Sequence, residues 1–504
     1  MNTYEPDLQT VQELARRSDN NVAPVFRDVP ADLETPVSAF LKVARGDHSF
    51  LLESVEGGER IARYSFIGTE PYRILRSGPY ADPSEGSDPL REIEAELSRY
   101  RLSHPKDVHG RHALPRFTGG AVGFLAYDAI RHFEPRVKVP SSDPQGLPEA
   151  LFMFVDALLV FDHLEHTIKV VAHCRLDGDV DASYRQACWR IDELARRLNS
   201  TLPASPYPVA APSHVQEALE SNVGRERYLE NVERCKKYIV AGDVIQVVPS
   251  QRLSRRTTAH PFSIYRALRT VNPSPYMYYL AMGDSYIVGA SPEMLVRVED
   301  GIVETHPIAG TRPRGRDPDE DDALEEELKG NEKERAEHVM LVDLGRNDIG
   351  RVSQPGTVKV GDFMIVERYS HVMHLVSRVT GKLRADHTPY DALRACFPAG
   401  TVSGAPKIRA MEIISELEPD RRGAYAGAVG YFDFSGNMDT CITIRTLAMK
   451  DGTAFVQCGG GVVYDSVPEM EYQETLAKAR AMLLAIDQAE AMEEGMVMTG
   501  SLGY

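Results

Sequence analysis

Residues 459–475 read GGGVVYDSVPEMEYQET, and the interpretation of the whole chain starts from this stretch. Three glycines close a β-branched strand, and glycine lets a strand end approach a ligand closely because no Cβ intervenes. A helix is predicted to begin at Pro468, where Ser466 and Glu469 would form a capping box. Acidic residues in a first helical turn often do no more than complement the helix dipole. The role of this helix therefore depends on which other segments face it.

Length, composition and charge limit the classes of protein that this sequence can encode. The 504 residues, of which 42% are hydrophobic, can bury a large core in two or three domains or in one fold built from two halves. A net charge of −17 argues against a non-specific nucleic-acid binder, although an anionic substrate is compatible with a locally positive site. The longest apolar run, residues 150–162, contains Asp156 and is too short to cross a bilayer, so we expect no membrane association.

The N-terminus and the cysteines indicate a reduced, cytoplasmic protein. The opening residues MNTYEPDLQT contain acids and no apolar segment, so no signal peptide is visible. The six cysteines are scattered, and none belongs to a CxxC pattern that would predict a metal site.

A linker rich in proline, serine and alanine, NSTLPASPYPVAAPSH at 199–214, marks the clearest boundary in the chain. It separates an N-terminal region, residues 22–198, from a second region, residues 215–490. The N-terminal region is predicted to end in a helix with Trp189 and Leu194 on its apolar side.

The predicted strands come in antiparallel runs, with long helices between the clusters, so the fold class is α+β. One of these helices is predicted to be long and continuous through residues 327–350. The sequence GGAVGFL at 119–125 is echoed by AGAVGYF at 426–432, an internal repeat that suggests two related sheets.

Two predicted helices each carry a pair of glutamates at i and i+3, namely Glu334 with Glu337 and Glu471 with Glu474. If the helices met across a pocket, the carboxylates would repel one another, and a hard divalent cation such as Mg2+ would resolve the repulsion. The alternative for Glu334 is that it belongs to the solvated charged face of residues 329–338.

Other motifs offer groups that could hold an anion. Gly310 and Thr311 form a backbone turn followed by arginines, and PAGTVSGAPK places Thr401 and Ser403 at a helix N-terminus, which is a natural anion site. Arg445 ends a predicted strand, and its planar guanidinium could hold a carboxylate bidentately. Each motif alone is weak, since a strand-end arginine is more often part of a surface salt bridge.

Seven motifs occur in one order along the chain: ASPE, PIAGTRPRG, AEHVMLVDLGRND, YSHVMHLVS, GTVSGAPK, CITIR and GGGVVYDSVPEMEYQET. Together they resemble the motifs of the chorismate-utilising enzymes, in particular the anthranilate synthase component I family, most densely over residues 225–485. The resemblance implies an α+β fold with two packed, mostly antiparallel sheets and flanking helices. It also implies Mg2+-dependent conversion of chorismate and ammonia to anthranilate and pyruvate, the first step of tryptophan biosynthesis.

The resemblance implies roles for individual residues as well. Glu293 would act as general acid toward the departing 4-hydroxyl of chorismate, His374 would assist later steps near the enolpyruvyl group, and Thr401 would line the site. Mg2+ would be held by Glu337 and Glu474, with Glu471 and Glu334 as further or water-mediated ligands. The carboxylates and ring of chorismate would be held by Gly310, Thr311, Tyr425, Arg445, Gly459, Gly460 and Gly461.

The sequences LLES and NPSPYM resemble the feedback element of the same family. They imply a tryptophan site formed by Leu52, Glu53, Ser54, Pro275, Tyr276 and Met277. Glu53 would pair with the amino group of the inhibitor, although a lone acid in an apolar run can also point to solvent from a half-buried strand. Because such a site would lie away from the Mg2+ helices, inhibition would be a coupling between two sites.

Two positions separate this chain from relatives with other products. Aminodeoxychorismate synthases carry a nucleophilic lysine where this chain has Ala309, and isochorismate and salicylate synthases carry a water-activating lysine where it has Gln246. Ammonia is therefore expected from outside, delivered by a glutamine amidotransferase subunit in a heterotetramer. The alternatives are an aminodeoxyisochorismate synthase, an aminodeoxychorismate synthase component I, and a tryptophan-binding regulator without catalysis.

Overall fold

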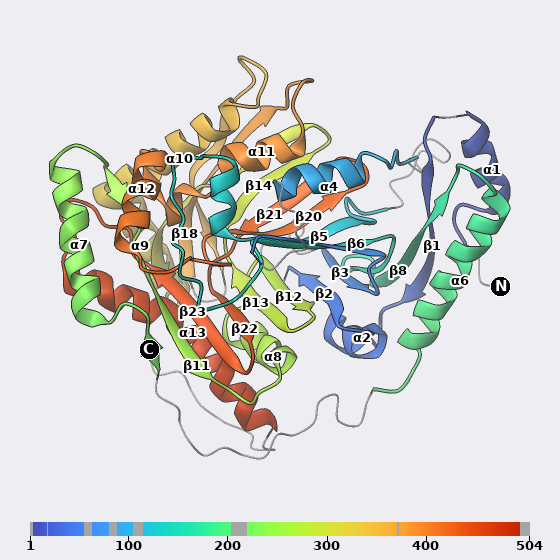
Figure 1. The fold of residues 1–504 in the computed structure, drawn as a ribbon, viewed down its shortest axis with the longest axis horizontal. Coiled ribbons are helices and arrows are strands. Elements are labelled where there is room, and N and C mark those ends of the chain that lie inside the picture. The colour runs from blue at the N-terminus through green and yellow to red at the C-terminus, as the bar shows by residue number, and fades with distance from the viewer. Residues whose placement is uncertain are drawn as a thin grey trace.

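The computed structural model of the chain describes residues 4–17, 19–54, 63–79, 88–103, 114–202, 219–369 and 372–493 (Figure 1). Most of the predicted linker, from residue 203 onward, lies outside these residues. None of the helices in this part of the chain combines the length and the apolar character that crossing a membrane requires.

Two large antiparallel sheets form the centre of the molecule. Within the described residues, the first has eleven strands in the spatial order β1 (Val22–Pro30), β8 (Thr167–Arg175), β7 (Ala157–Asp162), β3 (Tyr64–Thr69), β2 (His48–Glu53), β12 (Tyr276–Met282), β13 (Ser285–Ser291), β22 (Thr446–Lys450), β23 (Thr453–Gly459), β11 (Ser250–Arg256) and β9 (Glu220–Ser221). Both regions of the sequence therefore contribute strands to this sheet.

The second sheet mixes the two regions in the same way. Its ten described strands are β16 (Ile308–Pro313), β18 (Val372–Lys382), β15 (Ile302–Thr305), β14 (Met294–Glu299), β21 (Met438–Ile442), β20 (Ala428–Asp433), β5 (Gly120–Leu125), β6 (Ala150–Val155) and β4 (Arg73–Ser77), with β17 (Lys359–Arg368) paired to β18. A separate short ribbon pairs β10 (Gln246–Val247) with β19 (Gly404–Ala405).

The sheets pack face to face, and helices cover their outer faces. Phe50 and Phe66 of the first sheet share a buried cluster with Phe124 and Tyr431 of the second. The first sheet is covered by α1 (Leu8–Arg17), α2 (Pro36–Val43), α6 (Val180–Leu198), α8 (Pro261–Val271) and α13 (Pro468–Glu493). The second is covered by α4 (Pro89–Leu97), α10 (Glu332–Gly350), α11 (Pro389–Cys396) and α12 (Lys407–Leu417). The predicted α+β class with two packed sheets is confirmed.

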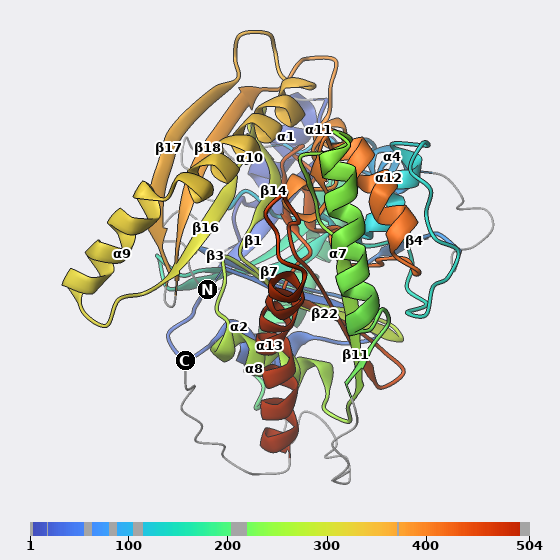
Figure 2. The same cartoon turned by 90° about the vertical axis from the view of Figure 1, so that its left-hand side faces the viewer.

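The remaining elements lie around α10 and α13. Helix α7 (Arg225–Val240) runs beside α13, and α9 (Pro318–Gly330) leads into α10 next to the long strands β17 and β18 (Figure 2). Two short 3-10 helices, η2 (Tyr127–His132) and η3 (Gly400–Val402), connect strands and helices near the second sheet.

The prediction that the internal repeat marks two related sheets is wrong. Both copies lie side by side in the second sheet. Strand β5 pairs antiparallel with β20, and Gly123 lies opposite Gly430. A Cβ on Gly123 would lie 1.9 Å from the carbonyl oxygen of Leu151, and one on Gly430 would lie 2.1 Å from that of Asp439. The shared glycines therefore let neighbouring backbones pack closely.

Two helix predictions were wrong in detail. The predicted continuous helix is divided at Asn331, which ends α9 and caps α10 by accepting a hydrogen bond from the Glu334 amide. Trp189 is 66% exposed, because the buried stripe of α6 runs through Ile191 and Leu194 on another face.

Candidate active site

The candidate site lies where α10, α13 and the ends of several strands meet. The Asn331 cap starts α10 so that Glu334 and Glu337 fall in its first two turns. Glu471 and Glu474 project from the first turns of α13, and Gly459 ends β23 just before that helix. The structure thus brings together the two glutamate pairs and the glycine run, whose ligand roles are still predictions.

Glu337 occupies the centre of the glutamate group. Burial raises its pKa, and the carboxylates of Glu334 and Glu474 raise it further, while an amide hydrogen bond from Gln246 to its Oε1 at 3.3 Å opposes the rise. Since Glu334 lies on α10 and Glu474 on α13, carboxylates from both helices face this residue. Among the described residues, no three His, Cys, Asp or Glu side chains already lie at the spacing that holds a metal ion.

The other three glutamates each have a partner within the chain. Arg312 donates a hydrogen bond to Glu334 at 3.2 Å, and Glu334 is therefore not purely part of a solvated face. Lys478 pairs with Glu474 at 2.7 Å. The Ser466 hydroxyl donates to Glu471 at 2.7 Å, while burial, reinforced by the carboxylate of Glu474, raises the pKa of Glu471.

The predicted capping box at the start of α13 is not formed. Ser466 accepts a hydrogen bond from the amide of Val463 at 3.0 Å and directs its own proton to Glu471, because the helix begins at Pro468, one residue later than a box from Ser466 to Glu469 would require. Glu469 instead pairs with Arg225 at 2.6 Å and accepts a hydrogen bond from Gln473 at 2.8 Å. Of the acids in the first turns of α13, Glu469 therefore points away from the site.

Glu293 and Thr401 form a second group. The Thr401 hydroxyl donates to Oε1 of Glu293 at 3.2 Å. Burial raises the pKa of Glu293 to about 8, and the Thr401 bond and the cation of Lys478 both oppose the rise. A carboxyl group that keeps its proton near neutral pH can act as a general acid.

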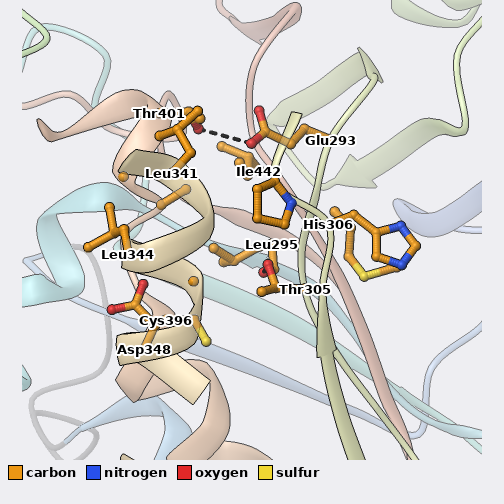
Figure 3. Close-up of a pocket in the computed structure, with 15 residues that line it drawn as sticks. Glu293, Leu295, Thr305, His306, Leu341, Leu344, Asp348, Cys396, Thr401 and Ile442 are labelled. Atoms are coloured by element: carbon orange, nitrogen blue, oxygen red, sulfur yellow. Dashed lines mark hydrogen bonds between the residues drawn. The ribbon is translucent and has the colours of Figure 1, made fainter. Parts of the chain in front are cut away.

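A small cavity of about 40 Å³ adjoins this pair (Figure 3). Figure 3 shows Glu293 and Thr401 joined by a hydrogen bond at one end, with apolar side chains of α10 and Ile442 around the space. Of the predicted site residues, Glu293 and Thr401 line this cavity, whereas the glutamates of α10 and α13 do not.

His374 lies on β18 beside the turn of β16. Its Nδ1 is 3.0 Å from the carbonyl oxygen of Gly310 and 3.1 Å from the hydroxyl of Thr311. Because a carbonyl oxygen only accepts, Nδ1 carries the proton and Nε2 is left as an acceptor. Burial lowers the pKa of His374 and the nearby cation of Arg445 lowers it further, while the hydrogen bond with the Gly310 carbonyl opposes the shift, so the surroundings favour the neutral ring.

The glycine run, Gly459–Gly461, packs directly against other residues of the site. A Cβ on Gly459 would lie 2.8 Å from the Tyr425 hydroxyl, one on Gly460 would lie 2.7 Å from a Glu471 carboxylate oxygen, and one on Gly461 would lie 2.7 Å from the Gln246 amide. A side chain at any of the three positions would collide with a different neighbour, so glycine at each position leaves room for that neighbour. Arg445, which adopts a positive φ of 52°, follows β21 and donates to the carbonyl of Lys478 at 3.3 Å.

The prediction that Ser403 belongs to an anion site was wrong. Its hydroxyl is fully buried and donates to the carbonyl of Ala399 at 2.7 Å, because the turn at η3 folds it inward. Thr401, two residues earlier, keeps its hydroxyl at Glu293.

Lys478 is a residue of the site that sequence reasoning missed. Its ammonium group contacts Glu474 and donates to the carbonyl of Gly459 at 2.9 Å, and it influences Glu293 as well. The available signal was its spacing of four residues from Glu474, which places both side chains on one face of the helix.

A separate cavity of about 70 Å³ lies between the two sheets. Its lining includes all six residues predicted to bind tryptophan, which are Leu52, Glu53, Ser54, Pro275, Tyr276 and Met277. Glu53 is only 5% exposed, so it does not point to solvent as simple strand alternation would place it. Tyr265 and Arg269 both donate to Oε2 of Glu53.

Aromatic and charged side chains complete this cavity. The rings come from Tyr64, Phe66, Tyr276, Tyr278 and Tyr431. Arg116 and Arg297 lie in the lining, and Arg297 donates to Asp439 at 3.0 Å. The cavity therefore offers an acid, arginines and aromatic faces in one enclosed space.

Comparisons with known proteins agree on one family. The family model described as chorismate binding enzyme matches residues 47–484. Anthranilate synthase component 1 from Acetivibrio thermocellus is 51% identical, with 96% of this chain and 99% of that protein covered. The protein of the same description from Saccharomyces cerevisiae is 44% identical, with 97% of each chain covered. The crystal structure of anthranilate synthase component I from Streptococcus pneumoniae TIGR4 matches with a TM-score of 0.73 and 37% identity, covering 90% of this chain and 98% of that one.

Proposed function

The chain belongs to the chorismate binding enzyme family, and from that premise we propose how its residues carry out the anthranilate synthase reaction. Full-length similarity to anthranilate synthase component 1 makes it a lyase of tryptophan biosynthesis, which converts chorismate and ammonia to anthranilate and pyruvate.

The observation that carries the proposed mechanism is the buried Glu293 carboxyl with a pKa raised to about 8 and a hydrogen bond from Thr401. As ammonia adds at C2 of chorismate, Glu293 donates its proton to the departing 4-hydroxyl, which leaves as water. His374, whose Nε2 is the accepting nitrogen of this tautomer, then assists removal of the C2 proton as the bond from C3 to the enolpyruvyl oxygen breaks, and the released enolpyruvate takes up a proton to become pyruvate. Loss of pyruvate leaves the aromatic ring of anthranilate.

Chorismate carries two carboxylates, and the site offers several groups to hold them. Arg445 supplies a guanidinium, Thr311 a hydroxyl, and Gly310 and Gly459–Gly461 supply backbone that can approach closely. Tyr425 lies against Gly459 and would contact the ring. These binding roles rest on the motifs and on the positions of the residues around the site.

The donor set also fits Mg2+. The carboxylates of Glu337 and Glu471 have pKa values raised by burial and by neighbouring carboxylates, and a hard divalent cation would relieve that repulsion. Glu337 and Glu474 would hold the ion, with Glu471 and Glu334 as further or water-mediated ligands. When bound, it would supply positive charge for a substrate carboxylate.

Ammonia is proposed to come from a partner. Ala309 and Gln246 occupy the positions where relatives carry lysines, so the chain has no side chain there to act as nucleophile or to activate water. The name component 1, carried by the relatives, implies a second component, and we propose a glutamine amidotransferase subunit in a cytoplasmic heterotetramer.

We propose that the cavity between the sheets binds tryptophan as a feedback inhibitor. Glu53 is held by Tyr265 and Arg269 through Oε2, which orients the carboxylate toward an amino group. The surrounding rings suit an indole, and arginines in the lining suit the carboxylate of the amino acid.

The reaction can be tested on the purified chain. Chorismate, Mg2+ and ammonium should yield fluorescent anthranilate, EDTA should abolish the product, and glutamine should replace ammonium only when the partner is added. Accumulation of a non-aromatic amino acid would mean that the lyase step is missing. A 4-amino product would contradict the significance given to Ala309.

A further inference from the structure

A buried ion pair lies directly behind the proposed catalytic groups. Arg422 is 2% exposed, and its guanidinium donates twice to the carboxylate of Glu418, from Nε at 2.8 Å and from Nη2 at 2.6 Å. Arg422 follows α12 by a few residues and Glu418 caps the C-terminus of that helix. Neither residue belongs to the set expected to contact chorismate or Mg2+.

The guanidinium also fixes two backbone segments of the site. Nη1 donates to the carbonyl of Val402 at 2.8 Å, and Nη2 donates to the carbonyl of Val248 at 2.7 Å. Val402 directly follows Thr401 in η3, so this bond fixes the turn that presents the Thr401 hydroxyl to Glu293.

Glu418 extends the contact along the second segment. Its Oε1 accepts hydrogen bonds from the amide and from the hydroxyl of Ser250, each at 2.8 Å. The carbonyl of Pro249 in turn accepts from the amide of Gly460 at 3.3 Å. The pair thus positions the backbone on which the glycine run rests.

Two rings enclose the same guanidinium. Its central carbon lies 4.7 Å from the centre of the Tyr127 ring and 5.5 Å from that of Tyr425. The Tyr425 hydroxyl faces Gly459, at the place where chorismate is expected. One planar cation therefore contacts a ring of the substrate site and the turn that carries Thr401.

We infer that Arg422, held by Glu418, is a positioning residue for the reaction, which sets Thr401 against Glu293 and Tyr425 against Gly459. This inference rests on the proposed function of the site. Arginine is required because one flat group makes four hydrogen bonds in fixed directions while its faces stack on two rings. A lysine could keep the charge but could not make this set of contacts.

If Arg422 acts through Thr401, its substitution should change how kcat depends on pH. Glu293 is faced by the Thr401 hydroxyl and the Lys478 ammonium, and the Thr401 bond lowers its pKa. If Arg422→Lys lets the η3 turn shift, that bond weakens and the alkaline limb of the kcat profile moves to higher pH. We expect kcat itself to fall roughly tenfold to a hundredfold, as small misplacements of catalytic groups do.

The test is a double-substitution experiment with anthranilate formation from ammonium as the assay. Arg422→Lys should move the alkaline limb in the wild-type background and should not move it further in Thr401→Val, which has already lost the bond. Glu418→Gln keeps the shape of the pair and should give the same pattern, so the test does not depend on one variant folding. A limb that stays in place, or that moves equally in both backgrounds, would overturn the inference.

Arg252 provides a matched control. It is 3% exposed, pairs with Asp420 at 2.8 Å and donates to the carbonyl of Arg421 at 3.2 Å, but it contacts neither Val402 nor Tyr425. Arg252→Lys should lower the melting temperature without moving the limb. If Arg252→Lys moved the limb as far as Arg422→Lys does, the inference would be overturned. If the wild-type chain formed no anthranilate, the proposed function would be contradicted instead.

Discussion

The Thr401 hydroxyl lies 3.2 Å from Oε1 of Glu293 and donates to a carboxyl group whose pKa burial raises to about 8. A general acid works while it holds its proton, so kcat should fall as pH rises through about 8. Thr401→Val removes a bond that favours the ionised form, and we expect its alkaline limb to lie at higher pH. A pH profile of kcat at saturating chorismate measures both effects, and identical limbs would contradict the role of the bond.

The raised pKa of Glu293 also predicts how the free energy of unfolding depends on pH. Its folded-state pKa of about 8 lies above the ordinary value of 4.5, so the stability contributed by the buried neutral acid is complete below about pH 4.5 and is lost as pH rises toward 8. Glu293→Gln cannot ionise and should be inactive, yet more stable at pH 8 by on the order of 4 kcal/mol, the free energy of a pKa raised from 4.5 to about 8 at about 1.4 kcal/mol per unit. Urea unfolding at pH 5 and pH 8 checks this, and the gain should shrink to less than about 1 kcal/mol at pH 5.

Mg2+ affinity should depend on the carboxylates that face one another across the site. Glu337→Gln removes the central carboxylate and should weaken Mg2+ binding roughly tenfold to a hundredfold, measured by calorimetry without chorismate. Glu469→Gln is the control, because Glu469 lies on the same helix as Glu474 but pairs with Arg225. Equal affinities in the two variants would remove Glu337 from the proposed ligands.

Tryptophan inhibition should respond to the cavity between the sheets. Ser54→Phe places a ring in a space of about 70 Å³, and Glu53→Gln removes the charge proposed for the amino group. We expect the inhibition constant to rise roughly tenfold or more in each variant, since the ring at position 54 fills the space and a hydrogen bond to a charged group contributes about 1.5–3 kcal/mol. The KM for chorismate should stay unchanged. Leu33→Phe adds a ring on the exposed surface and should leave inhibition intact; full inhibition of Ser54→Phe would rule out this location.

Lys478→Met should affect both substrate binding and the acid. The ammonium group contacts the carbonyl of Gly459 at 2.9 Å and lowers the pKa of Glu293. Its loss should raise the KM for chorismate about tenfold, the scale of one charge-assisted hydrogen bond, and should move the alkaline limb upward. Arg480→Met removes a cation from an exposed position of the same helix and should change neither quantity.

Local patterns predicted the classes of element well, while pairings between distant segments were not predictable from them. The α+β class followed from antiparallel runs separated by helices. The position of the repeat did not, because the pairing of β5 with β20 depends on the packing of both complete sheets. Trp189 was placed wrongly because only its apolar character was weighed; the buried stripe through Ile191 and Leu194 leaves position 189 on another face.

The site could be predicted where it is built from side chains in ordered motifs. Glu293, Thr401 and the glutamates of α10 and α13 were named from the sequence; the structure pairs Thr401 with Glu293 and lets carboxylates of both helices act on Glu337, while the roles of these residues stay predictions. Lys478 and Arg422 were missed because the bonds that tie them to the site go to backbone carbonyls, those of Gly459 and Val402, while their carboxylate partners lie four residues away along the chain. A motif records which side chain is present, but it does not record where a distant carbonyl will lie.

The pairing of β5 with β20 has a consequence for synthesis of the chain. The amide of Thr118, just before β5, bonds to the side chain of Asp433 across a separation of 315 residues. At about 5–20 residues per second, a ribosome needs roughly 15–60 s to make that interval. During that time β5, whose six residues are all buried in the finished protein, has an unpaired apolar edge. Premature termination before β20 would therefore release an aggregation-prone fragment.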